Sequence, residues 1–291
     1  MNNPSSSNRR LRFHDSHAGP VARPVFMSRT PSGGSSDPSD DRPTRVASES
    51  KPGGAKPSTE RSPKSKDGVS PFHVKICGIT RVEDARDTVR VGVDAIGLNF
   101  YPPSPRSIDL DQAEQIRAVI PESVAAIGLF VNESSDRIVE IAARLKLDFV
   151  QLHGDEPPEF LTELGSLRVI RALRVGEGGA ADVCRYIDRC RQLDARPELL
   201  LLDAMVKGAY GGTGQRFDPQ VAREIGELPD MPPVILAGGL TPDNVADAIR
   251  AARPVAVDTA GGVETAKGIK SADLVRQFNS SARRAFEELG R

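Results

Sequence analysis

Tryptophan is absent from this chain of 291 residues, and cysteine occurs only three times. Cys77, Cys184 and Cys190 form a sparse, odd-numbered set, which does not suit a disulfide framework. Free thiols are typical of a reducing compartment, so we expect a cytoplasmic protein. The four histidines do not cluster with the cysteines at the spacing of a metal site, so we expect no bound metal.

Long apolar runs are also missing. No stretch approaches the roughly 20 apolar residues that a membrane helix needs. The basic N-terminus is not followed by the apolar segment of a secretory signal. The formal net charge is only −1, which argues against a dedicated nucleic-acid binder. We therefore expect neither a membrane nor a nucleic acid as partner, and the sequence leaves monomer and homodimer open.

Residues 1–71 have little of what a folded domain needs. Of the first 70 residues, 15 are Ser, 9 are Pro and 6 are Gly, while Phe13 and Phe26 are the only aromatic residues. Such a segment buries too little apolar area to offset its conformational entropy, so we expect a disordered tail. Its 12 Lys and Arg against 7 Asp and Glu leave two interpretations, a basic interaction arm or an extension without a role. The lack of any motif favours the second.

From Phe72 to Arg291, short apolar runs alternate with helical segments. Continuous apolarity indicates strands that are covered on both faces, as in parallel sheets. Eight strand–helix units predict an α/β fold of the (β/α)₈ TIM-barrel type over residues 72–291. A doubly wound open sheet is the alternative, but its glycine fingerprint after the first strand is missing. The expected strands are 73–77, 95–100, 125–131, 149–152, 169–173, 199–202, 234–237 and 255–257.

Helices are expected between and after these strands. Several have a residue suited to the N-cap, and Pro219 and Pro242 suit the first turn of a helix. The expected caps are Asp109, Ser135, Asp218 and Thr241. The expected helices are 81–91, 109–119, 135–145, 158–164, 180–193, 218–225, 241–251 and 271–289.

Glycine pairs follow the seventh and eighth strands. In TIM barrels these two loops often bind phosphate through backbone N–H groups, which glycine leaves open to an anion. The pairs are Gly238-Gly239 and Gly261-Gly262. A single pair would equally suit a tight turn, but two pairs in the two expected loops favour phosphate binding. The glycine-rich segment 208–215 follows the sixth strand and is expected to be a hinged loop over the barrel mouth.

Four polar side chains also stand at strand ends or just beyond them. Asp203 ends a run of four leucines, where a carboxylate is either a general acid or the partner of a nearby cation. Cys77 is either a base or nucleophile, or a small buried apolar residue, and an isolated cysteine favours the latter. Arg106, on a proline-rich loop, suits a bound carboxylate or open solvent. His153 either orients a carboxyl group or is a satisfied core histidine.

Together these segments resemble the phosphoribosylanthranilate isomerase family of tryptophan biosynthesis. The motifs K-I-C-G-I-T and Q-L-H-G-D-E are the specific ones, and the glycine pairs are shared with other phosphosugar barrels. The resemblance runs in order through residues 72–279. It rests on 74–80, 104–106, 128–132, 150–154, 201–203, 210–214, 237–245 and 257–264.

The resemblance implies an Amadori rearrangement of N-(5-phosphoribosyl)anthranilate, an aldose–ketose isomerisation of a small phosphosugar. Asp203 would be the general acid and Cys77, as a thiolate, the general base. No cofactor is implied, because the nitrogen of the substrate accepts the electrons. The substrate-binding residues would be Arg106 on the anthranilate carboxylate, Gly238, Gly239, Gly261 and Gly262 on the phosphate, and also His153 and Asp258.

One departure and three rival functions accompany this interpretation. The family usually has a serine pair where this chain has Ala260-Gly261, which removes hydroxyl donors and leaves backbone N–H groups. A histidine-pathway isomerase would resemble this barrel but carry an aspartate in place of Cys77. A ribulose-phosphate epimerase would need metal-binding histidines at its strand ends. An inactive phosphate-binding barrel would lack Cys77, Asp203 or Arg106, and all three are present.

Overall fold

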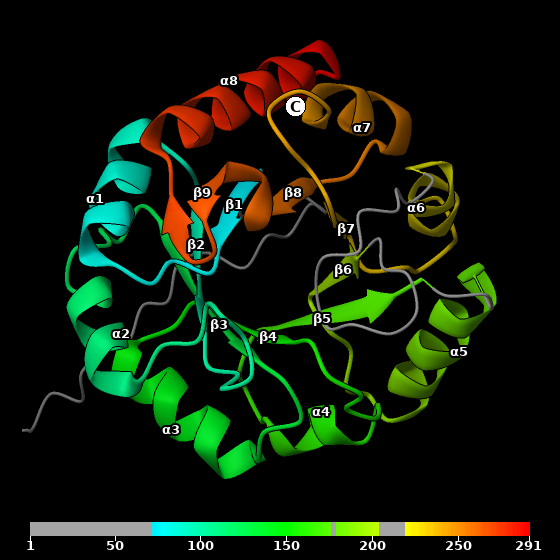
Figure 1. Cartoon of the computed structure of the whole chain (residues 1–291). Coiled ribbons are helices and arrows are strands. Elements are labelled where there is room, and N and C mark those ends of the chain that lie inside the picture. The colour runs from blue at the N-terminus through cyan, green and yellow to red at the C-terminus, as the bar shows by residue number, and fades with distance from the viewer. Residues whose placement is uncertain (1–71, 176–178, 204–218) are drawn as a thin grey trace, which may run out of the picture. The chain divides into compact units, whose positions relative to one another are not determined.

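Eight parallel strands close into a barrel in chain order, the first pairing with the last. This computed structural model describes residues 72–175, 179–203 and 219–291. Figure 1 shows the strands at the centre of a ring of helices, which confirms the predicted TIM barrel. The barrel strands are β1 (Val74–Cys77), β2 (Ala95–Asn99), β3 (Ala125–Phe130), β4 (Phe149–Leu152), β5 (Val169–Arg174), β6 (Leu199–Asp203), β7 (Val234–Ala237) and β8 (Ala256–Thr259).

Helices follow the strands in turn and cover the outside of the barrel (Figure 1). None of the described helices is long and apolar enough to cross a membrane. After β8, the 3-10 helix η1 (Gly261–Val263) and the antiparallel pair β9 (Glu264–Ala266) and β10 (Ile269–Lys270) precede the last helix. The α-helices are α1 (Val82–Val91), α2 (Leu110–Arg117), α3 (Ser135–Leu145), α4 (Phe160–Glu163), α5 (Gly179–Gln192), α6 (Pro219–Gly226), α7 (Val245–Ala252) and α8 (Ala272–Glu288).

Two separate groups of buried apolar residues lie on the two sides of the barrel wall. The larger group includes helix residues, so it seals the sheet against the helices. The smaller group includes no helix residue and fills the barrel interior. Because successive strand residues point to opposite faces, strands β2 to β8 contribute to both groups. The continuous apolar runs of the sequence therefore follow from burial on both faces.

Most strand and helix ends differ from the expected ones by one or two residues, but α7 begins later. The sequence predicts this helix from Thr241, with Thr241 as its cap and Pro242 in its first turn, whereas α7 begins at Val245. Asn244 accounts for the difference. Its carboxamide accepts from Thr241 N at 2.8 Å and donates to Gly239 O at 3.0 Å. These bonds hold 241–244 in a turn, so the expected cap at Thr241 is wrong.

The other expected caps have mixed outcomes. Asp109 caps α2 as predicted, its side chain accepting from a backbone N–H of the first turn. Helix α3 is capped by Ser134, and Ser135 is instead its first residue. Pro219 opens α6 as predicted. Asp218, the cap expected for α6, lies outside the described residues.

Asp94 fastens the start of the barrel to its end. Its Oδ2 accepts from the backbone N–H groups of His73 and Val74 at 3.0 and 2.9 Å, just as β1 begins. Its Oδ1 accepts from Arg283 of α8 at 2.7 Å. Asp94 thus ties the first strand to the last helix, at the barrel end opposite the carboxyl ends of the strands.

A buried ion pair braces the loop that follows β4. Arg171 of β5 donates to Glu156 Oε2 at 2.7 Å, and the two side chains are only 3% and 2% exposed. Arg171 also donates to the carbonyl oxygens of Leu152 and Gly154, each at 3.0 Å. Buried charges are tolerated when they are paired, and here Glu156 and the two carbonyl oxygens satisfy both terminal nitrogens of Arg171. This arginine therefore holds the loop in place.

Candidate active site

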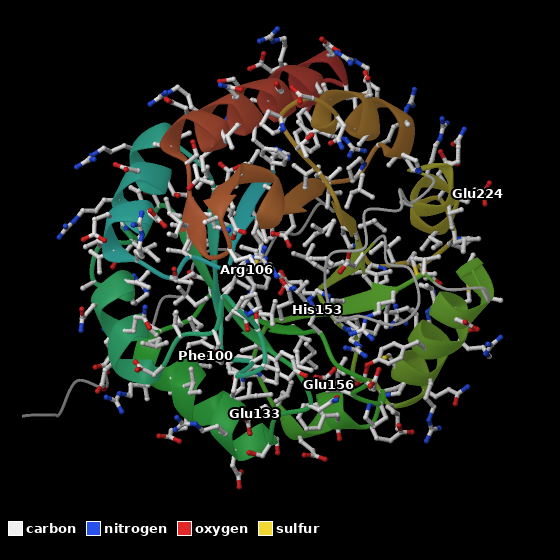
Figure 2. All side chains as sticks on the ribbon, viewed as in Figure 1. Phe100, Arg106, Glu133, His153, Glu156 and Glu224 are labelled. Carbon is white, nitrogen blue, oxygen red and sulfur yellow. The ribbon has the colours of Figure 1, made fainter. Side chains whose placement is uncertain are left out.

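Three of the predicted site residues stand at the inner, carboxyl-terminal ends of strands. Cys77 ends β1, Asp203 ends β6 and His153 directly follows β4. Alternation places Asp203 on the same face as Leu201, which belongs to the barrel interior. In a closed parallel barrel these strand ends border one mouth. Figure 2 shows His153 and Arg106 inside the ring of helices.

The Cys77 thiol lies beside an ammonium group. Cys77 is 6% exposed, and its thiol and the ammonium of Lys75, two residues earlier on the same strand, both lie beside Gly97. Lys75 in turn donates to Asp258 Oδ1 at 2.9 Å. Burial raises the pKa of the Cys77 thiol, and the charges of Lys75 and Lys270 offset only part of that rise. Asp258, for which the family resemblance implies substrate binding, is thus hydrogen-bonded to Lys75.

Asp203 is linked to His153 and, through it, to Gln151. His153 Nε2 lies 3.3 Å from Asp203 Oδ2, and His153 Nδ1 lies 3.0 Å from Gln151 Nε2. With the Gln151 amide donating to Nδ1, the imidazole carries its proton on Nε2 and donates it to Asp203. The side chains of His153 and Asp203 are 20% and 18% exposed, so both are open to the mouth. The histidine therefore contacts the Asp203 carboxyl group, and its role in the site stays a prediction.

Arg106 reaches across the end of β1. A Cβ built on Gly78, which follows Cys77, would come within 2.5 Å of Arg106 Cδ, and one on Gly261 within 3.2 Å of its Nη2. The two glycines thus leave room for this side chain between the first and last strands. Arg106 Nε and Nη2 donate to the two oxygens of Glu264, each at 2.7 Å. Arg106 is therefore a fixed side chain and not a solvated one.

Glu264 is shared by two cations. Besides Arg106, it accepts from Lys270 Nζ at 2.7 Å, and Lys270 also donates to Ala260 O at 2.9 Å. Burial alone would raise the pKa of Glu264, but the hydrogen bonds from Arg106 and Lys270 outweigh it and lower that pKa. Burial lowers the pKa of Lys270 despite the nearby carboxylate. The pair β9–β10 thus presents a charged cluster to the mouth.

The two glycine-bearing loops pack directly on each other. Thr259 Oγ1 donates to Leu240 O at 2.7 Å. A Cβ on Gly262 would overlap that same carbonyl oxygen, so only glycine permits this approach. Gly238 and Gly239 have φ of 94° and 65°, in the left-handed region that favours glycine. The structure therefore brings the two predicted phosphate loops together.

Sequence reasoning missed the roles of Lys75, Gln151 and Lys270. Lysine and glutamine are rarely buried without a partner, and both Lys75 and Gln151 are fully buried within apolar strands. That contrast was the available signal in the sequence. Lys270 lies in a short hairpin without a recognisable motif. The predicted hinged loop 208–215 lies outside the described residues.

Comparisons with known proteins agree with this geometry. The family model for N-(5'phosphoribosyl)anthranilate (PRA) isomerase matches residues 74–281. An N-(5'-phosphoribosyl)anthranilate isomerase of Geobacter metallireducens is 47% identical over 205 residues, which are 70% of this chain and 96% of that protein. The corresponding enzyme of Azotobacter vinelandii is 48% identical over 213 residues, covering 72% of this chain and 97% of that one.

Solved structures are similar as well. The crystal structure of phosphoribosyl anthranilate isomerase from Thermotoga maritima has a TM-score of 0.64 and 37% identity, and covers 73% of this chain and 99% of that one. A phosphoribosyl anthranilate isomerase in complex with reduced 1-(o-carboxyphenylamino)-1-deoxyribulose 5-phosphate has a TM-score of 0.60 and 35% identity, with the same coverage. The barrel, its mouth and these matches together show that the chain belongs to the N-(5'-phosphoribosyl)anthranilate isomerase family.

Proposed function

We propose that this protein converts N-(5-phosphoribosyl)anthranilate to 1-(2-carboxyphenylamino)-1-deoxyribulose 5-phosphate, the Amadori rearrangement of tryptophan biosynthesis. The observation that carries the proposal is the placement of one carboxyl group and one thiol on inner strand ends of a barrel of this family. Asp203 ends β6 and Cys77 ends β1. The reaction needs one acid and one base on different sides of a sugar, which this arrangement supplies.

Asp203 acts as the general acid in the first step. Its carboxyl proton goes to the ribose ring oxygen, and the bond from that oxygen to C1 breaks. The lone pair of the anthranilate nitrogen forms the C1–N double bond of a protonated imine. The bond from His153 keeps the Asp203 carboxyl group oriented towards the mouth.

Cys77 acts as the general base in the second step. Its thiolate removes the proton on C2, and the electron pair forms the C1–C2 double bond while the C1–N double bond becomes single. The resulting enolamine tautomerises, moving a proton from the C2 hydroxyl to C1 and leaving a ketone at C2. One proton is gained and one lost, so the product is an isomer of the substrate. The substrate nitrogen is the electron sink, so the route needs no metal or organic cofactor.

Arg106 and the two glycine-bearing loops hold the ends of the substrate. Arg106 donates to Glu264 from its Nε and Nη2 atoms. None of the described residues accepts a hydrogen bond from its Nη1. The outer edge of the guanidinium therefore suits the anthranilate carboxylate. The backbone N–H groups of Gly238, Gly239, Gly261 and Gly262 suit the phosphate.

The test is turnover of freshly generated phosphoribosylanthranilate, followed by the loss of anthranilate-type fluorescence. The wild-type protein is expected to turn it over. Cys77→Ser and Asp203→Asn are each expected to lose most of kcat, on the order of a hundredfold or more, with an unchanged circular dichroism spectrum. A wild-type rate in either variant would overturn the assignment of acid and base.

Matched variants control for the loss of a thiol or a carboxylate elsewhere. Cys184→Ser removes a cysteine of α5, and Asp94→Asn removes a carboxylate at the opposite end of the barrel. Both are expected to retain kcat and KM, although Asp94→Asn should lower the melting temperature. A wild-type protein without turnover would refute the proposed activity itself.

A further inference from the structure

We propose that Lys75 is a positioning residue for Cys77: its ammonium, held by Asp258, binds the thiol sulfur and stabilises the thiolate. This inference rests on the proposed function only in that Cys77 serves there as the base. Lys75 is not expected to touch the substrate, because it lies one inward-facing position deeper on β1 than Cys77.

The Cys77 sulfur and the Lys75 ammonium both lie beside one residue of β2, Gly97. A Cβ built on Gly97 would lie 2.8 Å from Cys77 Sγ and 3.2 Å from Lys75 Nζ. Gly97 is the register partner of Cys77 across the β1–β2 ladder. The absence of a side chain at Gly97 therefore leaves the space in which the two groups meet. The charge of Lys75 therefore acts on the Cys77 thiol at short range and favours the thiolate.

Asp258 and Cys77 both favour the charged form of Lys75. The two residues are register partners across the β1–β8 ladder, and Lys75 Nζ donates to Asp258 Oδ1 at 2.9 Å. Burial opposes the charge on Lys75, which is fully buried, but Asp258 and Cys77 outweigh it and raise the lysine pKa. Lys75 is therefore an ammonium at neutral pH and offers N–H donors to both partners.

A purely structural role would not require these charges. An apolar pair of similar volume fills a barrel interior at equal or lower cost than a buried ion pair. The neighbouring inward positions on β7, Ile235 and Ala237, are filled in that way. The Lys75–Asp258 ion pair instead lies one inward-facing position below Cys77. Among the described residues, Cys77 is the one cysteine at a strand end.

The groups around Cys77 have opposing effects on its ionisation. Lys75 of β1 and Lys270 of β10 lower the thiol pKa, whereas burial and Asp258 of β8 raise it. Arg106, from the loop after β2, is a further cation that interacts electrostatically with the thiolate. Gly97 of β2 carries no charge. Substituting Lys75 and substituting Asp258 are therefore expected to shift the Cys77 pKa in opposite directions.

The experiment measures the Cys77 pKa without any substrate. Full-length protein is alkylated with iodoacetamide across a pH series, and the rate at the Cys77 peptide is followed by mass spectrometry, apart from Cys184 and Cys190. Lys75→Met is expected to move the midpoint to higher pH, by about one unit or more, which is about tenfold less thiolate at neutral pH. Asp258→Asn is expected to move it to lower pH.

A double variant keeps the test valid if Lys75→Met alone does not fold. Lys75→Met with Asp258→Asn leaves no unpaired buried charge, and its midpoint is expected above that of Asp258→Asn alone. Lys75→Met should also lower kcat more than it raises KM, with part of the loss recovered at higher pH. An unchanged midpoint in Lys75→Met, or equal midpoints in the double variant and Asp258→Asn, would overturn the inference. Failure of the proposed function would appear separately, as a wild-type protein with no turnover.

Discussion

Arg106 and Glu264, 158 positions apart in the chain, meet through two parallel hydrogen bonds of 2.7 Å at the barrel mouth. A guanidinium held in this way loses little further conformational entropy when it binds a carboxylate. We therefore predict that Glu264 influences substrate binding through Arg106.

Substituting Glu264 by glutamine should weaken substrate binding. Glu264→Gln is expected to raise KM on the order of tenfold, with a smaller change in kcat, because Arg106 loses its charged partner. Steady-state kinetics would measure both constants. Glu198→Gln is the matched control, since Glu198 makes the same two-bond pair with Arg168 near the starts of β5 and β6. Equal effects of the two substitutions on KM would contradict the role of Glu264.

Glu264 should also contribute to acid stability. Its pKa in the folded protein is lowered, because the hydrogen bonds from Arg106 and Lys270 outweigh burial. A lowered folded pKa gives stability that is complete above the unfolded value, here about 4.5, and is lost as pH falls through the folded value. Urea unfolding should therefore show wild type more stable than Glu264→Gln near neutral pH, with the difference shrinking below about pH 4.5. A difference that is independent of pH would count against this assignment.

The buried pair of Arg171 and Glu156 should matter for stability and not for turnover. Glu156→Gln leaves the Arg171 guanidinium buried without an anion, which is expected to cost about 3–5 kcal/mol in urea unfolding. The folded fraction of Glu156→Gln should keep a kcat near the wild-type value. Glu114→Gln, which breaks the exposed pair with Arg144, should change stability little. A similar loss of unfolding free energy in the two variants would show that burial does not determine how much an ion pair contributes to stability.

Packing of the two glycine-bearing loops predicts a selective effect on phosphate binding. Gly262→Ala places a methyl group on the carbonyl oxygen of Leu240, so the loops must separate. The expected result is a higher KM and weaker inhibition by inorganic phosphate, at a nearly constant kcat. Gly226→Ala is the control, since the nearest atom to its new methyl group, on Val234, is 3.5 Å away. Unaltered phosphate inhibition in Gly262→Ala would argue against phosphate binding at these loops.

The domain boundary at residue 72 is testable by truncation. All eight barrel strands lie between Val74 and Thr259, so removing residues 1–71 is expected to leave kcat/KM and Tm nearly unchanged. Phe72 should be the first residue that the fold requires. It is 2% exposed and packs edge-on against Phe149, with the two ring centroids 5.9 Å apart. Phe72→Ala in the shortened chain should cost about 3–5 kcal/mol. A large loss of Tm on removal of 1–71 alone would place part of the tail within the folded unit.

Local sequence signals were sufficient for the barrel and for the inward position of Cys77 and Asp203. Apolar runs depend on burial of both sheet faces, and alternation along a strand fixes which residues share a face. The partners of those residues were not predictable in the same way. Glu264 meets Arg106 only because the hairpin after β8 folds back over the mouth, and no local pattern encodes that path. The late start of α7 also escaped prediction, because the Asn244 side chain competes with the helix for backbone bonds.

Asp94 bonds both to the start of β1 and to Arg283 of α8, so the first strand of the barrel depends on the last helix. A ribosome delivers β1 first, yet the neighbours of β1 on one side, β8 and α8, emerge last. Until then Lys75 has no Asp258 to pair with, and the sheet has an open edge that invites wrong partners. The surroundings of Cys77 therefore depend on β8, which is synthesised after the other seven strands of the barrel.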